Sequence, residues 1–233
     1  MSPAGGPDDG EEARAFFTWV HELVAAGDPR LRALGAVETA YATAAAAVAQ
    51  RVRHSVWHMT LVPSWTQVGV ARPFAELRHR PAMDLRYLTS GRALTRLPLL
   101  ASHHHPYLRV GHVVDSMLVV DGARIFVGEP HSVTPVTSVW ESTDGRVVAA
   151  AVRVFDAAWR SAEPAIAPGE DPPFTRRMVQ VAFHLTAGAS DREIARALGV
   201  SVRTVSAEVA EIVRRLGARS RTHAIGLITG AAY

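Results

Sequence analysis

A short stretch near the C-terminal end of the chain carries hydrogen-bond donors spaced along about one and a half turns of a helix. Ser201, Arg203, Thr204 and Ser206 lie within six residues of one another, with Val202 among them. An arginine guanidinium can donate two parallel hydrogen bonds to the edge of a guanine, and serine and threonine suit phosphate through the hydroxyl or the thymine methyl through their apolar atoms. These residue types favour recognition of double-stranded DNA rather than the making or breaking of bonds.

Two predicted amphipathic helices must position these donors, and they lie within Gly188–Gly217. Ser190 is the expected N-cap of the first helix, and Glu193, three residues on, is the partner that a capping box requires. Gly199 follows the first helix where its C-cap favours positive φ, and Ser201 then caps the second helix. A helix, a glycine turn and a second helix form a helix-turn-helix, whose second helix enters the major groove.

A longer pattern in the last part of the chain extends this interpretation. Its residues are Phe174-Thr175-x-Arg177, Gly188-x-Ser190-x-x-Glu193-Ile194-Ala195, Leu198-Gly199-Val200-Ser201-x-x-Thr204-Val205, Arg215-Leu216-Gly217 and Ser220-Arg221-Thr222-x-Ala224. Residues 174–233 thereby resemble the LuxR/FixJ/GerE type of helix-turn-helix. The resemblance implies an all-α domain of four helices without a wing, with helices at about 175–187, 191–198, 202–216 and 221–229. The third of these would enter the major groove.

The resemblance also implies which residues would contact DNA or a second copy of the chain. The predicted DNA-binding residues are Arg192, Ser201, Val202, Arg203, Thr204, Ser206, Arg214 and Arg215. The predicted dimerisation residues are Ala224, Ile225, Leu227 and Ile228, which are equally suited to closing the core of the four helices.

Three positions depart from the family pattern. Ser206 and Glu208 stand where the family often has Lys and His, so one copy is expected to bind DNA with modest affinity. Met178 replaces a Glu and removes the usual partner of Arg221.

Composition and charge agree with a DNA-binding module at the C-terminal end. All 25 basic residues are arginine. Residues 174–233 contain nine of these arginines and four acidic residues, a net charge of +5. The rest of the chain carries 16 arginines and 18 acidic residues, a net charge of −2. A basic module on a near-neutral body fits binding to a phosphate backbone. The absence of cysteine excludes disulfides, thiolate metal sites and cysteine nucleophiles.

The preceding residues alternate between strand and helix patterns, which predicts an α/β sensor or regulatory domain over 11–160 with a mixed sheet and flanking helices. Residues 1–10 are expected to form a disordered tail, and the proline-rich segment 161–173 a linker before the DNA-binding domain at 174–233. The expected helices lie at 11–26, 29–53, 65–80, 91–100 and 144–159. The expected strands lie at 56–62, 85–88, 107–110, 116–120, 125–127 and 136–141, with a hairpin turn at Asp121-Gly122.

One hairpin pattern resembles a different family. The segment Ser116-Met-Leu-Val-Val-Asp121-Gly-x-x-Ile-Phe-Val-Gly128 is similar to the active motif of phospholipase D-like folds, and the domain resembles a degenerate, TrmB-like sensor. The enzymes use His-x-Lys-x-x-x-x-Asp, with His as nucleophile and Lys stabilising the phosphoryl charge. Here Val114 and Ser116 take the His and Lys positions, so no catalytic residue is expected and Asp121 is interpreted as a turn residue.

Two further residue groups leave alternatives open. His103, His104 and His105, with His112, Asp115 and His131, form either a metal-binding tract or, as we favour, a solvated loop before Pro106. No metal or cofactor is therefore expected. The scattered aromatic residues are expected to pack in the core rather than to line a ligand pocket. They are Trp57, Trp65, Phe74, Tyr87 and Phe126.

The sequence thus predicts a DNA-binding transcription regulator that acts as a homodimer under a non-catalytic N-terminal domain. Neither a signal peptide nor a membrane-spanning segment is visible, so the expected location is the cytoplasm. RNA polymerase and an unknown small-molecule ligand are open as further partners. Two alternative functions remain: a phospholipase D-like phosphodiesterase with an accessory DNA-binding tail, and a protein-interaction regulator without DNA affinity.

Overall fold

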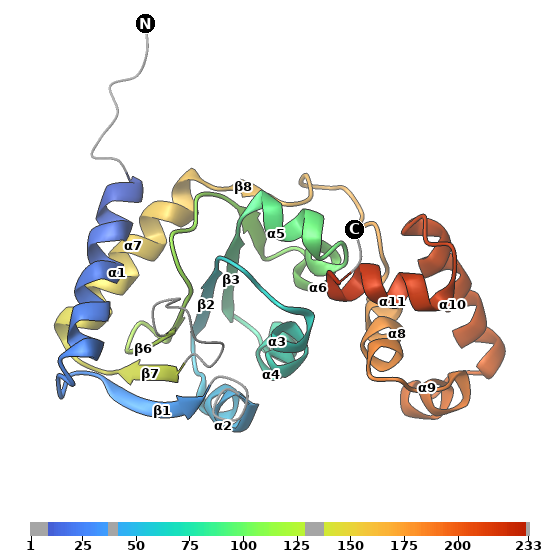
Figure 1. Ribbon diagram of the computed structural model, residues 1–233, viewed down its shortest axis with the longest axis horizontal. Helices are drawn as coiled ribbons and strands as arrows, with labels where there is room; N and C mark the ends of the chain where they lie inside the picture. Colours follow the sequence, from blue (N-terminus) through green and yellow to red (C-terminus); the bar gives the residue numbers. More distant parts are fainter. Residues whose placement is uncertain (1–8, 37–41, 129–137, 232–233) are drawn as a thin grey trace, which may run out of the picture. The chain divides into compact units, whose positions relative to one another are not determined.

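The computed structural model describes residues 9–36, 42–128 and 138–231, and Figure 1 labels most of their helices and strands. The chain divides into two compact units. The sheet unit comprises residues 1–62, 70–90 and 107–164, and the helical unit comprises residues 63–69, 91–106 and 165–233. The helical unit therefore contains two segments that precede residue 161 in the chain. Among the described residues, no helix has the length and apolar character needed to cross a membrane.

A mixed sheet of eight strands organises the sheet unit, as the predicted α/β class requires. Its order is β1-β7-β6-β5-β2-β3-β4-β8. The pairs β2–β3 and β3–β4 are parallel, and the remaining pairs are antiparallel. The strands are β1 (Arg32–Ala36), β2 (Ser55–Thr60), β3 (Asp84–Thr89), β4 (Leu108–Val110), β5 (Met117–Val120), β6 (Arg124–Gly128), β7 (Ser138–Ser142) and β8 (Glu163–Pro164).

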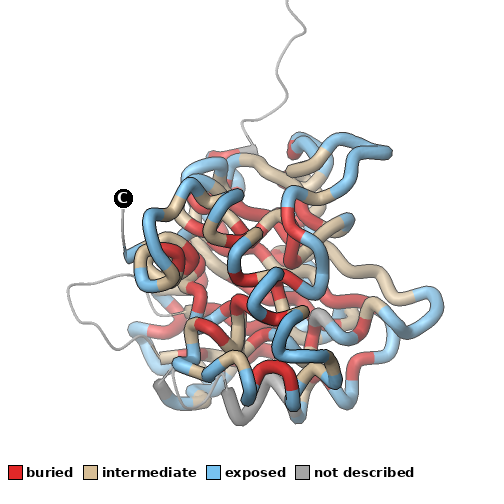
Figure 2. Tube along the Cα trace, turned by 90° about the vertical axis from the view of Figure 1, so that its right-hand side faces the viewer, coloured by how far each residue is buried: buried red, intermediate tan, exposed pale blue. Residues whose placement is uncertain are grey.

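Helices cover both faces of this sheet, which explains why all four residues of the central strand β5 are apolar and buried. Successive side chains of a strand point to opposite faces. Met117 and Val119 accordingly pack in one core with residues of α1 (Asp9–Ala25) and α7 (Gly145–Ser161). Leu118 and Val120 pack in the other, with residues of α2 (Ala42–Arg51), α4 (Arg72–Ala75) and the 3-10 turn η2 (Glu76–His79). Figure 2 shows that the buried segments of the chain, in red, are concentrated in the interior.

Helix α7 illustrates how local sequence produces one of these layers. The carboxylate of Asp144 accepts hydrogen bonds from the amides of Arg146 and Val147, which satisfies donors of the first turn. Val147, Ala151, Val154, Phe155 and Ala158 then recur on one side of the helix and are buried. The predicted helix over 144–159 is therefore confirmed to within two residues.

Two local expectations about this unit are wrong. The sequence predicts one helix over 29–53, but Arg32–Ala36 forms edge strand β1, paired antiparallel with β7 and shifted in register between Ala33 and Gly35. Gly35 has φ +109, which a helix does not accommodate. Backbone pairing with β7 thus overrides the helix propensity of alanine. In the proline-rich segment after α7, β8 (Glu163–Pro164) pairs with β4, so part of the expected linker belongs to the sheet. The expected tail at residues 1–10 lies outside the described residues up to residue 8, and α1 begins at Asp9.

The helical unit contains the four predicted C-terminal helices together with three helices from earlier in the chain. The C-terminal helices are α8 (Arg176–Thr186), α9 (Asp191–Leu198), α10 (Val202–Arg215) and α11 (Arg221–Thr229), each within one residue of its predicted bounds. The earlier helices are α3 (Trp65–Val70), α5 (Gly91–Arg96) and α6 (Leu100–His104).

Contacts of α8 show how the earlier helices join the unit. The ring of Trp65 stacks on Phe183 with centroids 4.5 Å apart, and its indole N–H donates to the Thr186 hydroxyl at 3.0 Å. His103 packs edge-on against the same Phe183 ring at 5.2 Å. The Ser102 hydroxyl accepts a hydrogen bond from the Phe174 amide just before α8. The helix-turn-helix therefore shares its core with α3 and α6.

The structure bears on two open questions: whether the histidine run forms a solvated loop or a metal-binding tract, and whether the aromatic residues pack in the core. The expectation of a solvated loop is wrong for His103, which lies in α6 and is only 5% exposed because it packs on Phe183. The described residues contain no group of three His, Cys, Asp or Glu side chains suited to a metal ion, and His131 lies outside them. Four of the five singled-out aromatic residues are buried, as the core interpretation predicts. They are Trp65, Phe74, Tyr87 and Phe126.

Candidate nucleic-acid interface

Helices α9 and α10 begin and end where the sequence predicts, because local hydrogen bonds determine their ends. The Ser190 amide and hydroxyl both donate to the Glu193 carboxylate at 2.7 Å, and the Glu193 amide donates back to the hydroxyl. The hydrogen bond from the Ser190 side chain is the main cause that lowers the pKa of Glu193. Gly199 closes α9 at φ +66, and the Ser201 hydroxyl caps α10 by accepting from the Thr204 amide. The predicted helix-turn-helix geometry is therefore present.

Helix α10 has a buried face and an exposed face. Val205, Val209 and Ile212 recur at helical spacing and are buried, which attaches the helix to the core of the unit. We call the opposite side the outer face of α10 and define it by its exposed residues. They are Val202, Arg203, Ser206, Ala207, Ala210 and Arg214; Arg215 is also exposed but binds the Pro173 carbonyl, so it is not counted in this face. Val202 is 43% exposed, which is unusual for a large apolar side chain in this structure.

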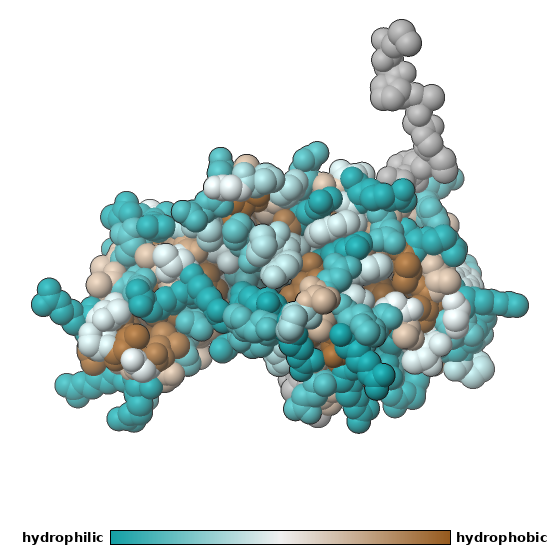
Figure 3. Space-filling model, turned by 180° about the vertical axis from the view of Figure 1, so that it is seen from behind, coloured by the Kyte–Doolittle hydropathy of each residue, from teal (hydrophilic) through white to brown (hydrophobic). Residues whose placement is uncertain are grey.

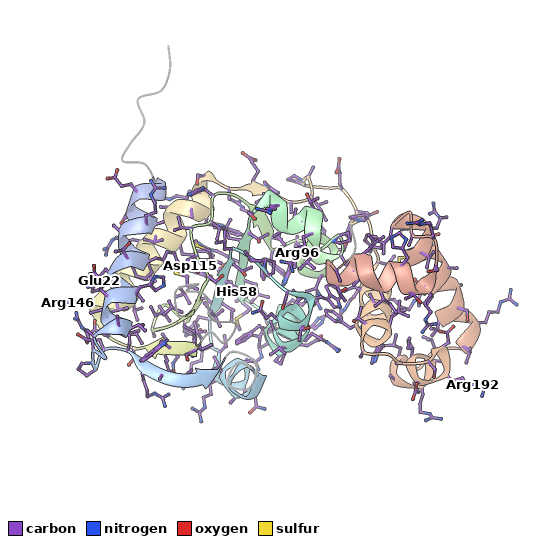
Figure 4. The ribbon with its side chains drawn as sticks, in the orientation of Figure 1. Glu22, His58, Arg96, Asp115, Arg146 and Arg192 are labelled. Carbon is purple, nitrogen blue, oxygen red and sulfur yellow. The ribbon has the colours of Figure 1, made fainter. Side chains whose placement is uncertain are left out.

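The predicted DNA-binding residues fall into two groups according to how their side chains are engaged. Arg192 and Arg203 are exposed, and Figure 4 shows Arg192 pointing away from α9. The hydroxyls of Ser201 and Thr204 bind each other at 2.8 Å. The Ser206 hydroxyl donates its proton to Asp191 at 2.7 Å, so it can bind a phosphate oxygen only by giving up that bond.

Met178 and Glu208 depart from the family pattern, and one ion pair compensates for each departure. Arg221 binds Asp191 and donates to the Ala189 carbonyl at 2.9 Å, which supplies the partner that Met178 cannot. Arg221, and then Ser206, lower the pKa of Asp191 by hydrogen bonding to its carboxylate. Sequence reasoning missed these contacts because their partners are distant in the chain.

Glu208 is the other departure, and its charge is compensated within the module. Its carboxylate accepts a hydrogen bond from Arg177 at 2.7 Å, and its side chain is only 11% exposed. The carboxylate therefore lies mostly away from solvent beside a cation from α8. Its expected repulsion of the DNA backbone is correspondingly reduced.

A third acidic residue engages both arginines at the end of α10. Glu211 accepts hydrogen bonds from Arg214, with Nε at 2.7 Å and Nη2 as a second donor, and from Arg215 Nε at 2.6 Å. These bonds, first from Arg214, lower the pKa of Glu211 to about 2. Arg215 also donates to the Pro173 carbonyl. Their i,i+3 and i,i+4 spacing is the sequence signal that could have revealed these pairs.

The predicted dimerisation residues on α11 are not equivalent. Ala224 and Ile228 are fully buried in the core of the helical unit, whereas Ile225 and Leu227 are half-buried. Only the second pair can contribute to an interface without rearrangement. The helix ends at Gly230, with φ +71, where an added Cβ would meet the Arg96 side chain at 2.8 Å.

The hairpin that resembles the phospholipase D motif has structural hydrogen bonds at its polar positions. Asp121 lies in the predicted turn at φ +54, and its carboxylate accepts from the amides of Arg53, His54 and Ser55 at 2.7–3.2 Å. Partial burial acts to raise the pKa of Asp121, but these amides outweigh it and lower the pKa. The Ser116 hydroxyl accepts from the Leu61 amide at 3.1 Å. Both polar groups of this hairpin thus accept hydrogen bonds from the backbone around β2.

Comparison with known families identifies the C-terminal module. Residues 172–228 match the model of the family described as bacterial regulatory proteins, luxR family. The predicted LuxR-type helix-turn-helix is therefore confirmed for this part of the chain. None of the curated proteins compared matches the chain.

Comparison with solved structures finds distant likenesses. Nuc, a phospholipase D family member from Salmonella typhimurium, is 11% identical over 59% of this chain and 98% of its own, with a TM-score of 0.46. TrmBL2, an archaeal chromatin protein, is 17% identical over 65% of this chain and 61% of its own, with a TM-score of 0.43. The Vibrio cholera VqmA–ligand–DNA complex is 18% identical over 51% of this chain and 50% of its own, with a TM-score of 0.25.

Proposed function

We propose that this protein is a sequence-specific DNA-binding transcription regulator that reads the major groove with the outer face of α10. The observation that carries the proposal is the division of α10 into two faces. Val205, Val209 and Ile212 attach the helix to the core, while the opposite side exposes small and cationic side chains. A helix presented in this way can approach base edges closely without losing its packing.

Individual side chains suit different parts of the DNA. Arg203 is exposed in the first turn of α10, where a recognition helix contacts base edges, and its guanidinium fits guanine O6 and N7. Val202 can contact a thymine methyl. Arg192 on α9 suits the phosphate backbone, and such contacts position a protein without specifying sequence. The face seen in Figure 3 is mainly hydrophilic, with apolar groups in small patches.

We assign the sheet unit a regulatory role without catalysis. The His and Lys positions of the phospholipase D motif hold Val114 and Ser116, and the Ser116 hydroxyl and the Asp121 carboxylate are both engaged with backbone amides. A valine cannot act as a nucleophile. We further propose a homodimer that uses Ile225 and Leu227 of α11, because paired half-sites extend the contact area of a small module.

The decisive experiment selects DNA from a random pool with the full-length protein and measures affinity for the selected duplex and a shuffled one by fluorescence anisotropy. Arg203→Ala should reduce the preference for the selected duplex by roughly 5- to 150-fold, since a bidentate contact contributes about 1–3 kcal/mol of discrimination. Arg146→Ala, an exposed arginine of α7 (Figure 4), is the charge-matched control.

Equal loss of preference in both variants would contradict the assignment of Arg203 to a base. Affinity that does not decline with added salt would contradict DNA binding through this basic module. That result would favour the alternative function of a protein-interaction regulator without DNA affinity.

A further inference from the structure

The four acidic residues of the C-terminal module differ in the side chains that bind their carboxylates. Asp191 binds Arg221 and Ser206, and Glu193 closes the capping box of α9. Glu208 is paired with Arg177 and largely buried. Each of these three carboxylates connects parts of the module. Glu211 differs because Arg214, one of its two partners, is 69% exposed on the outer face of α10.

The two arginines bound to Glu211 are unequal. Arg215 is 35% exposed and also donates to the Pro173 carbonyl, so it remains attached to the segment before α8 when Glu211 is absent. Arg214 directs two guanidinium nitrogens to the Glu211 carboxylate. This bidentate arrangement is the one a guanidinium also uses to bind phosphate. Glu211 and a DNA phosphate would therefore compete for the same donors of Arg214.

We infer that Glu211 restrains Arg214 and thereby sets the DNA affinity and the salt dependence of the module. The inference rests on the proposed function, because it names a residue that adjusts DNA binding. The low pKa of Glu211, about 2, keeps the carboxylate ionised throughout the physiological pH range. The restraint is therefore constant, and it ends only when the phosphate displaces the carboxylate or the carboxylate is removed.

The size of the effect follows from counterion release. Each phosphate contact changes the slope of log K against log salt by about −0.9, which corresponds to roughly eightfold in affinity at about 0.1 M salt. Glu211→Gln frees one guanidinium, so it should tighten binding about eightfold and steepen the slope by about 0.9. Arg214→Ala in the otherwise unchanged protein should alter affinity by less than about twofold, because Arg214 is already occupied.

The test uses the full-length protein and a fluorescein-labelled duplex of mixed sequence of about 30 base pairs, since phosphate contacts dominate binding that lacks sequence preference. Affinities are measured by anisotropy across a series of salt concentrations. Glu22→Gln makes the same charge change at an exposed position of α1 (Figure 4) and should leave affinity unchanged. Circular dichroism verifies that each variant is folded, and Glu211→Ala provides a second variant with the same expected gain.

The double variant Glu211→Gln/Arg214→Ala identifies the freed cation. The inference is supported if the gain from Glu211→Gln disappears in the double variant. It is overturned if Glu211→Gln resembles Glu22→Gln, or if the gain persists without Arg214. If neither the unchanged protein nor Glu211→Gln binds the duplex at low salt, the proposed function fails as well. If the unchanged protein binds normally but Glu211→Gln has no effect, only this inference fails.

Discussion

Replacing Trp65 with alanine tests whether the helix-turn-helix depends on helices from earlier in the chain. Trp65 is 5% exposed, stacks on Phe183 and donates its indole N–H to Thr186. All three residues belong to the helical unit, but Trp65 lies more than a hundred positions before the two others. Its removal therefore leaves the local sequence of α8–α11 intact while taking away part of their shared core.

The expected loss of stability is large for a unit of this size. Removing a buried tryptophan typically costs about 3–5 kcal/mol, which includes the cavity left beside its neighbours. Stacked aromatic pairs contribute about 0.5–1.5 kcal/mol beyond their burial, and a hydrogen bond contributes about 1 kcal/mol. Trp65→Phe retains a ring against Phe183 and loses the indole donor, so it should cost only about 1–2 kcal/mol. Because whole domains are stable by about 5–15 kcal/mol, Trp65→Ala should markedly increase opening of the helical unit.

Hydrogen exchange measured by mass spectrometry gives the local readout. Amides in α8 (Arg176–Thr186) should exchange much faster in Trp65→Ala than in the unchanged protein, and those in α7 (Gly145–Ser161) should change little. Urea unfolding gives the corresponding free energies, with Trp65→Phe as the intermediate case. Unchanged exchange in α8 would refute the conclusion that α3 completes the core of the DNA-binding module.

Two other variants test single positions. Asp121→Ala should reduce stability by about 1–3 kcal/mol because three backbone amides lose their acceptor. Since the folded-state pKa of Asp121 is lowered, its contribution is complete above the unfolded value near 3.9 and disappears as the pH falls through the folded value. The difference in urea midpoint between the unchanged protein and Asp121→Asn should accordingly shrink as the pH falls below about 4, and a difference that grows with falling pH would contradict this role. Gly199→Ala should cost about 1 kcal/mol from backbone strain alone, because Gly199 has φ +66 and no atom lies within 4 Å of the added Cβ. Urea unfolding measures this loss, and Gly145→Ala, in the first turn of α7 and equally uncrowded, is the control that should be neutral or slightly stabilising.

Local sequence determined the helix-turn-helix almost completely. Ser190 with Glu193, Gly199 and Ser201 specify where α9 and α10 begin and end through hydrogen bonds that span at most a few residues. The Asp121-Gly122 turn that joins β5 to β6 is equally local, and the structure confirms this hairpin. Such features can be read from the sequence because all the atoms involved are neighbours in the chain.

Tertiary structure alone decided which distant partners these elements acquire. Arg32–Ala36 is a strand because β7 pairs with it, although its own residues favour a helix. His103 is buried because Phe183 lies against it, and the charge of Glu208 is compensated because α8 places Arg177 beside it. No pattern in one segment specifies a partner scores of residues away, since that choice depends on how all the apolar faces pack together. The helices of the helix-turn-helix were therefore visible in the sequence, whereas their contacts with distant residues were not.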